Sequence, residues 1–214
     1  MSKPWIERNR SLSLKQQWEN LYNIKVKQNN KGLWGAGEGI LNAQAIIDFL
    51  PGLFKELDVK TFIDCGCGNF FWMNKVGFGE VKYTGVDIVN DLIESNKIKY
   101  PGVDFRCMNI VDEVVPKNDL VFARSVFIHL TIKDILKSIK NLKKSGSTYL
   151  MTSTSPQVKC NKDTECILLV KRNMTLEPFN WPEPIILLNE RPDIKDPKIL
   201  PKVSYMGIWE IEKL

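Results

Sequence analysis

Apolar residues along the chain form short continuous runs that alternate with stretches of helical periodicity. The runs predict five strands, over residues 61–65, 81–88, 103–107, 120–123 and 148–153. Between them, apolar residues recur every three or four positions, which predicts helices over 42–57, interrupted near Pro51, then through Asn74, over 89–100 and over 132–143. Strands that alternate with helices in this way favour an α/β fold of the doubly wound type.

The pattern changes after the fifth strand. Residues 155–183 are polar and rich in proline, which predicts a long connecting loop. Two further strands are predicted at 185–188 and 206–211, without a convincing helix between them. We therefore expect this last pair of strands to be antiparallel.

The stretch Thr61-Phe62-Ile63-Asp64-Cys65-Gly66-Cys67-Gly68-Asn69 joins a short apolar strand to an acidic turn with two glycines. Such a turn brings backbone N–H groups and a helix N-terminus to the carboxyl edge of a sheet, where doubly wound folds bind ligands. The dinucleotide fingerprint requires a third glycine at position 71, and this residue is Phe71. A pyrophosphate is disfavoured for that reason, and Asp64 would also repel it. A carboxylate at this place could instead pair with a cationic amino group, which indicates a ligand with an amino-acid-like end.

A second acid follows the second predicted strand. Asp87 lies nineteen residues beyond Gly68, at the end of Val81-Lys82-Tyr83-Thr84-Gly85-Val86-Asp87-Ile88. A carboxylate at the end of a parallel strand can accept hydrogen bonds from both vicinal hydroxyls of a ribose. The two acidic motifs together predict a site for a nucleoside with an amino-acid end.

On these motifs the chain resembles the class I S-adenosylmethionine-dependent methyltransferases. The resemblance runs through D-x-G-x-G at 64–68, Asp87, and the strand at 119–125 that is followed by Phe127-Ile128-His129-Leu130. Four further motifs resemble a group of small bacterial and phage methyltransferases: Trp34-Gly35-Ala36-Gly37-Glu38-Gly39, Trp72-Met73, Leu188-Asn189-Glu190 and Gly207-Ile208-Trp209. The likeness covers residues 30–214.

The resemblance implies S-adenosylmethionine as the cofactor and a single Rossmann-like, doubly wound domain. Its seven-stranded sheet would be mostly parallel, with the last strand inserted antiparallel. We expect residues 40–214 to form this methyltransferase domain. Residues 1–39 are expected to supply a covering segment, made of an amphipathic helix over 12–24 and a glycine-rich loop over 25–39. One side of that helix carries Leu14, Trp18 and Leu21.

The resemblance also implies which residues hold the cofactor. Asp64 would face the methionine amino group, Gly66 and Gly68 would let the backbone approach, and Asp87 would bind the ribose. Asn109 stands where the family has an acid for the adenine amino group, and its amide oxygen can still accept that bond. The remaining residues expected around the cofactor are Trp34, Gly35, Gly37, Trp72, Ile88, Ile110 and Arg124. For the two tryptophans, packing in the core is an alternative role.

Methyl transfer from a sulfonium is an in-line displacement, so the protein mainly aligns the reactants and takes a proton where one is released. His129 is the single histidine and follows the fourth strand, so it is the candidate base, with a structural role as the alternative. Arg124 could hold a phosphate or carboxylate with its planar fork, or pair with an acid such as Asp87 or Asp112. Ser125 stands where similar chains carry an acid.

Composition and net charge limit the kinds of partner that the protein is expected to bind. The net charge is +5, but lysines such as Lys137, Lys140, Lys143 and Lys144 fit the solvated side of an amphipathic helix. Nucleic acid is therefore an unlikely partner, and the surplus favours a small anionic acceptor, either phosphorylated or linked to a sugar or nucleotide. The five cysteines follow no zinc spacing, so no metal site is expected. Without a long apolar run or a signal peptide, a soluble, cytoplasmic protein with reduced thiols is expected.

Three other functions remain open at this point. A nucleic-acid methyltransferase would carry N-P-P-Y or D-P-P-Y at the fourth strand, where this chain has Arg124-Ser125-Val126-Phe127. A non-catalytic protein that binds S-adenosylmethionine would explain the departures at Asn109 and Ser125. A hydride-transferring Rossmann enzyme would bind NAD and not S-adenosylmethionine.

Overall fold

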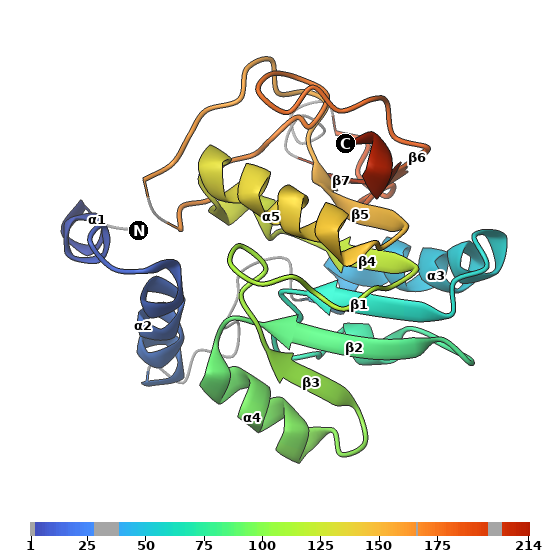
Figure 1. Ribbon diagram of the computed structural model, residues 1–214, viewed down its shortest axis with the longest axis horizontal. Coiled ribbons are helices and arrows are strands. Elements are labelled where there is room, and N and C mark those ends of the chain that lie inside the picture. Colours follow the sequence, from blue (N-terminus) through green and yellow to red (C-terminus); the bar gives the residue numbers. More distant parts are fainter. Residues whose placement is uncertain (1–2, 28–38, 166, 197–202) are drawn as a thin grey trace.

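The computed structural model describes residues 3–27, 39–165, 167–196 and 203–214. A seven-stranded sheet forms its centre, with strand order β3-β2-β1-β4-β5-β7-β6 (Figure 1). The strands are β1 (Thr61–Cys65), β2 (Lys82–Asp87), β3 (Asp104–Cys107), β4 (Leu120–Ala123), β5 (Tyr149–Thr154), β6 (Ile186–Asn189) and β7 (Tyr205–Glu210). The first five strands pair in parallel, and β7 lies antiparallel between β5 and β6. The predicted fold is confirmed, including the inserted last strand.

Five α-helices accompany the sheet in the described part of the chain: α1 (Lys3–Asn9), α2 (Leu14–Lys27), α3 (Ile40–Glu56), α4 (Asn90–Lys99) and α5 (Ile132–Ser145). Short 3-10 helices occur at Met73–Lys75, Phe127–His129 and Ile211–Lys213. None of the helices in these ranges is long and apolar enough to cross a bilayer.

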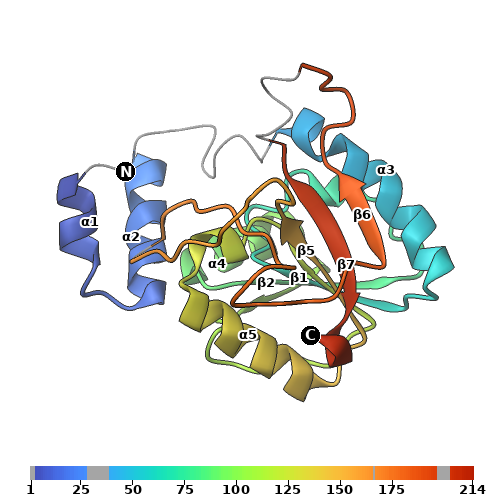
Figure 2. The same cartoon turned by 90° about the horizontal axis from the view of Figure 1, so that it is seen from above.

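The helices cover both faces of the sheet, and successive residues of β1 show why. Phe62 packs in one apolar cluster with residues of α3, whereas Ile63 packs in another with residues of α5. Side chains alternate between the faces along a strand, so a continuous apolar run such as that of β1 serves both layers. Figures 1 and 2 show α3 and α5 on opposite sides of the sheet, which leaves its carboxyl edge for ligands.

Two helix predictions were wrong. The interruption at Pro51 does not occur, and α3 continues through it because Leu50 and Leu53 are fully buried on either side and hold the helix against the sheet. The helix expected through Asn74 is only the 3-10 turn Met73–Lys75. Phe70 has a φ of 58° and its ring packs 4.8 Å from that of Tyr83, so aromatic packing holds this segment out of helical geometry.

The connection over residues 155–183 contains no helix or strand among its described residues, as expected. Two asparagines organise it, which the sequence pattern did not indicate. Asn161 donates from Nδ2 to the carbonyls of Asn173 and Glu177, both at 2.9 Å, and its Oδ1 accepts from the backbone N–H of Asn173 at 2.9 Å. Side-chain amides thus replace the backbone pairing that a regular element would supply.

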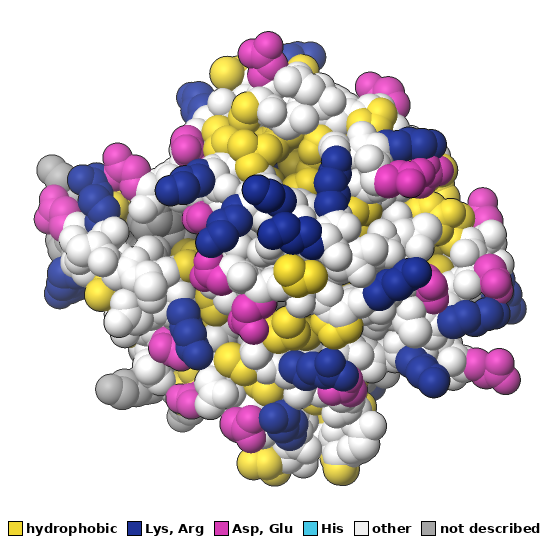
Figure 3. All heavy atoms as spheres, in the orientation of Figure 1, with side chains coloured by type: hydrophobic (Ala, Val, Ile, Leu, Met, Phe, Trp, Pro, Cys, Tyr) yellow, Lys and Arg dark blue, Asp and Glu magenta, His cyan; other side chains and the backbone are white. Residues whose placement is uncertain are grey.

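Charged side chains of both signs are interspersed over the face shown in Figure 3. On α5, the four lysines named above are exposed, whereas Ile135, Ile139 and Leu142 are buried. Lys137 also pairs with Asp112 at 2.5 Å. The prediction that these lysines form a solvated helix face is confirmed.

Candidate functional site

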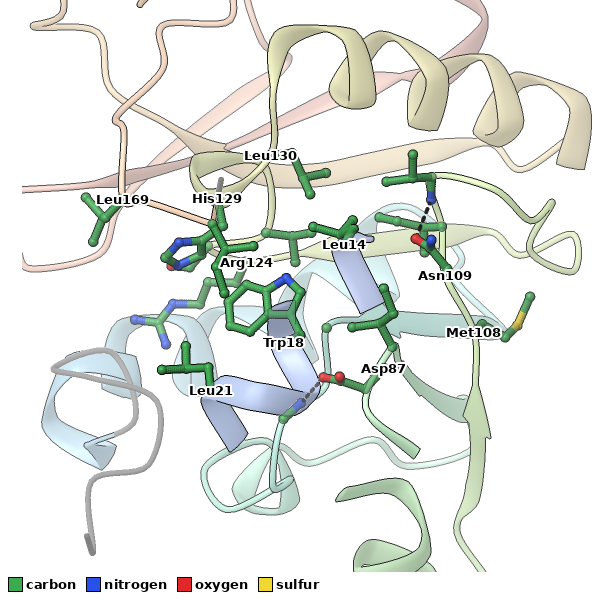
Figure 4. A pocket seen from close by; sticks show the side chains of 18 of the residues that line it. Leu14, Trp18, Leu21, Asp87, Met108, Asn109, Arg124, His129, Leu130 and Leu169 are labelled. Atoms are coloured by element: carbon green, nitrogen blue, oxygen red, sulfur yellow. Dashed lines mark hydrogen bonds between the residues drawn. The ribbon is translucent and has the colours of Figure 1, made fainter. Parts of the chain in front are cut away.

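A pocket of about 410 Å³ opens at the carboxyl edge of the parallel strands. Its floor comes from the turns that follow β1, β2, β3 and β4, and α2 and the segment 167–169 cover it (Figure 4). The lining residues are Leu14, Trp18, Leu21, Lys25, Gly66, Gly68, Asp87, Ile88, Met108, Asn109, Ile110, Val111, Arg124, Ser125, Val126, His129, Leu130, Ile167, Leu168 and Leu169. Segments far apart in the sequence therefore meet around one cavity.

The glycine turn forms the part of the floor after β1. Gly66 has a φ of +77°, and a Cβ on it would lie 2.7 Å from Cγ2 of Val126. The backbone N–H of Gly66 donates to the carbonyl of Val86 at 2.8 Å, which ties the turn to β2. Any side chain at position 66 would therefore meet both backbone strain and a collision.

Asp87 supports the turn and also faces the cavity. Its Oδ2 accepts from the N–H of Gly68 at 3.2 Å, and its Oδ1 accepts from the N–H of Val89 at 3.0 Å. Burial raises the pKa of Asp87, and these backbone donors oppose that rise. Each carboxylate oxygen keeps a second lone pair for a ligand, so the carboxylate can orient the turn and accept from hydroxyl groups together.

Met108, Asn109, Ile110 and Val111 form a mostly apolar wall after β3. The side chain of Asn109 is used within its own turn, because Oδ1 accepts from the N–H of Val111 at 3.1 Å and Nδ2 donates to Oδ2 of Asp112 at 2.6 Å. The amide oxygen retains one lone pair for a ligand. This turn-closing role is a function of Asn109 that the sequence did not reveal.

Asp64 and Trp72 are not among the residues that line this pocket. Both lie on the α3 side of the sheet, where Asp64 is 4% exposed and accepts from the hydroxyl of Tyr83 at 3.0 Å. Burial raises the pKa of Asp64 to about 7, and nearby Asp87 acts in the same direction. The Tyr83 hydrogen bond and the positive charge of Arg124 act against the rise.

Arg124 connects that polar group to the pocket. Its Nε and Nη2 donate to Oε2 of Glu190 at 2.9 and 2.7 Å, and Nη2 also donates to the carbonyl of Asn42 at 2.9 Å. The guanidinium carbon lies 5.1 Å from the ring centroid of Trp72. The alternative expected for Arg124, an ion pair with an acid, is confirmed, but the acid is Glu190 and not Asp87 or Asp112. The position of β6 beside the inserted β7 brings Glu190 to this place.

His129 lines the pocket, and its ring packs edge-on against Trp18 with 5.2 Å between ring centroids. The imidazole is hydrogen-bonded to the backbone of Leu168 and Ile167. Its Nδ1 is buried and finds no hydrogen-bond partner within the described part of the chain. Burial and, to a smaller extent, the charge of Lys25 lower the pKa of His129 to about 4 against the opposing effect of its backbone hydrogen bonds, so the imidazole is neutral at neutral pH.

The apolar side of α2 lies over the cavity. Leu14, Trp18 and Leu21, which the periodicity placed on one side of a helix, all line the pocket and pack with Ile167 (Figure 4). Lys25 lines the same pocket from the last turns of α2. The residues Trp34, Gly35 and Gly37, also expected near the cofactor, lie outside the described residues.

The glycine turn, Asp87, the Asn109 wall, Arg124 and His129 thus surround one cavity. A nucleoside fits its chemistry, because a carboxylate can meet a ribose and the apolar wall can meet a base. A neutral imidazole at the same cavity adds a group that can accept a proton. These groups together fit a group-transfer site that binds a nucleoside cofactor.

Comparisons with known proteins agree with this description. A family model described as "Methyltransferase domain" matches residues 57–189, which is more than half of the chain. No curated protein sequence matches the chain significantly.

Solved structures resemble it in fold. Magnesium protoporphyrin IX methyltransferase from Synechocystis PCC 6803, with bound S-adenosylmethionine, is 14% identical with a TM-score of 0.66, over 94% of this chain and 99% of that one. The N-methyltransferase NodS from Bradyrhizobium japonicum WM9, with S-adenosylhomocysteine, is 12% identical with a TM-score of 0.62, over 89% and 98%. The methyltransferase domain of a bacterial Hen1 is 15% identical with a TM-score of 0.58, over 78% and 98%.

At these identities the structural likeness concerns the fold, and the family model establishes the membership. Together they confirm the resemblance that the glycine turn and Asp87 indicated. The chain therefore belongs to the methyltransferase domain family.

Proposed function

We propose that this methyltransferase binds S-adenosylmethionine in the pocket at the carboxyl edge and methylates a small acceptor. The observation that carries the proposal is the convergence of Gly66, Gly68, Asp87 and Asn109 on one cavity of about 410 Å³. This set offers a glycine turn open to close approach, a carboxylate for two hydroxyls and a wall for a flat base.

The residues present fit the cofactor at each of its parts. Asp87 would hold the ribose, Ile88, Met108 and Ile110 would contact the adenine, and Asn109 would accept from its amino group with its remaining lone pair. Arg124, which lines the pocket, would meet the amino-acid end, and the buried acid Asp64, which does not line it, would reach the ammonium through a bridging water. The cofactor supplies a methyl group activated by its sulfonium.

His129 is assigned the role of proton acceptor. Its unpartnered Nδ1 and its neutral state allow it to take a proton from an acceptor hydroxyl or amine. With a pKa of about 4 it cannot deprotonate a hydroxyl in advance. It can take the proton while the new bond to the methyl group forms, because the acceptor oxygen or nitrogen then becomes acidic. A weak base is sufficient for general-base catalysis at that stage.

The acceptor we propose is a small anionic compound, such as a phosphorylated, sugar or nucleotide-linked metabolite. Arg124 is paired with Glu190 and assigned to the amino-acid end of the cofactor, so the cation that would attract an anionic acceptor is Lys25, which lines the pocket from α2. We also propose a cytoplasmic location, which the sequence led us to expect.

The test is a methyl-transfer assay with labelled S-adenosylmethionine over phosphorylated sugars, nucleotides and their dephosphorylated forms. We expect turnover with a phosphorylated acceptor and its selective loss in Lys25→Met. Preferred methylation of the dephosphorylated forms would refute the anionic acceptor and leave the cofactor assignment in place. Binding of S-adenosylmethionine without turnover on any acceptor would favour the non-catalytic alternative that Asn109 and Ser125 suggest.

A further inference from the structure

Arg124 and Glu190 form a buried ion pair at the side of the pocket that faces α3. Their side chains are only 8% and 5% exposed, and Oε2 of Glu190 accepts from both Nε and Nη2 of Arg124. The other oxygen, Oε1, is buried and has no hydrogen-bond partner within the described residues. Glu190 was part of the Leu188-Asn189-Glu190 motif, and the proposed function assigns it no role.

Stability alone is a poor explanation for such a pair. Desolvation of two charges offsets much of their attraction, and apolar residues often stabilise a core equally well. An unpaired carboxylate oxygen adds a further cost. The location of the pair in the fold is more informative than its contribution to stability.

The Arg124–Glu190 pair adjoins a third charged group. The positive charge of Arg124 acts on Asp64, which is buried on the same side of the sheet. If Arg124 were released from Glu190, its charge would remain beside a buried carboxylate on which it already acts, that of Asp64. Glu190 therefore holds the guanidinium beside Trp72 and Asn42. Among the described residues, Asp64 forms no salt bridge with the guanidinium, although the charge of that group acts on it.

We propose that Glu190 is a positioning residue that acts through Arg124 to prepare the site for the amino-acid end of the cofactor. An amino acid carries a carboxylate and an ammonium, so its recognition needs a fixed cation and an acid that the cation has not neutralised. Glu190 secures both, because it fixes Arg124 and leaves Asp64 to meet the ammonium. This inference rests on the proposed function.

The experiment compares two ligands that share the nucleoside. S-adenosylhomocysteine carries the amino-acid end, and 5′-methylthioadenosine lacks it. Calorimetric titration of Glu190→Gln is expected to show about tenfold or greater weakening for S-adenosylhomocysteine and less than about twofold for 5′-methylthioadenosine, because only the former uses the charged groups. The matched control is Asp193→Asn, which breaks the more exposed Arg191–Asp193 pair on the same turn and should change neither affinity.

A double-mutant cycle tests whether Glu190 acts through Arg124. The losses in Arg124→Met and Glu190→Gln should be strongly non-additive in the double variant. Glu190→Asp retains the charge and should recover part of the preference for S-adenosylhomocysteine. Because the preference is a ratio, incomplete folding of a variant affects both ligands alike.

Equal weakening of the two ligands in Glu190→Gln, with no recovery in Glu190→Asp, would show a structural role only and overturn the proposal. Unchanged binding of both ligands by Glu190→Gln would also overturn this proposal. In that case, binding of both ligands by the wild type would still uphold the cofactor assignment. A wild-type protein that binds neither ligand would overturn the proposed function, and this proposal with it.

Discussion

The buried acid Asp64 should make cofactor affinity depend on pH. Its pKa rises from 3.8 to about 7 in the folded protein, mainly because burial removes the carboxylate from water. A rise of the pKa from 3.8 to about 7 corresponds to about 4 kcal/mol against the ionised carboxylate. If the cofactor's ammonium pairs with this carboxylate, binding must select the ionised form, and one proton leaves the protein when the ligand binds below pH 7.

The affinity for S-adenosylhomocysteine should therefore fall about 50-fold between pH 7 and pH 5, with a slope that approaches tenfold for each pH unit at the acid end of this range. Calorimetry in two buffers of different ionisation enthalpy should count about one proton released at pH 6. 5′-Methylthioadenosine retains the ribose, so it reports any contribution from Asp87 and should lack the Asp64 dependence. In Asp64→Asn, the slope for S-adenosylhomocysteine should disappear.

The stability of the free protein gives a second readout of the same group. Between pH 3.8 and about 7 the folded state holds a proton on Asp64 that the unfolded state has lost, so this contribution to stability is complete below 3.8 and is lost as pH rises through 7. Asp64→Asn should gain stability relative to wild type over that range. Equal affinity for S-adenosylhomocysteine at pH 5.5 and 7.5, or the same slope in Asp64→Asn, would refute the reasoning.

Four other variants test the site. His129→Gln should lower kcat by about 100-fold and leave S-adenosylhomocysteine affinity within about twofold. The wild-type kcat, measured at saturating S-adenosylmethionine, should stay flat near neutrality and fall only as pH approaches the pKa of about 4. A pH profile centred near 6.5 would contradict a buried, neutral imidazole. Gly66→Ala should cost about 1–3 kcal/mol in urea unfolding, because its Cβ would lie 2.7 Å from Val126 at positive φ. Gly68→Ala has open space and should cost less, so equal losses would count against the collision. Trp18→Ala should speed dissociation of S-adenosylhomocysteine about tenfold in stopped-flow measurements, and an unchanged rate would show that α2 does not cover the bound ligand.

The strands were predictable because each is a short apolar run bounded by turn residues. β1 and β4 begin and end at the predicted residues, since both are buried on two faces and turn residues follow them; the one acid within β1 is Asp64, next to its last residue. The Asp64–Gly68 turn and Asp87 were recognisable for the same reason: they are local motifs at strand ends. Pro51 was misread because local propensity cannot show how strongly Leu50 and Leu53 are buried.

The hydrogen-bond and ion-pair partners of the polar residues in the site were harder to predict from the sequence. Arg124 and Glu190 lie 66 residues apart, and they meet only because β7 is inserted between β5 and β6. The use of Asn109 within its own turn depends on Val111 and Asp112, which no spacing rule distinguishes from solvent-exposed neighbours. Such pairings follow from tertiary geometry, so a single sequence indicates the residue types without their partners.

The most direct test of the central claim is calorimetric titration of the wild-type protein and Asp87→Ala with S-adenosylmethionine, S-adenosylhomocysteine and NAD, with His129→Ala as the matched control. We expect the wild type and His129→Ala to bind the first two ligands with dissociation constants on the order of 10 μM. Asp87→Ala should bind neither, because it loses both the ribose acceptor and the brace on Gly68. Undiminished binding of S-adenosylhomocysteine by Asp87→Ala, or binding of NAD in place of both, would contradict the assignment of this pocket.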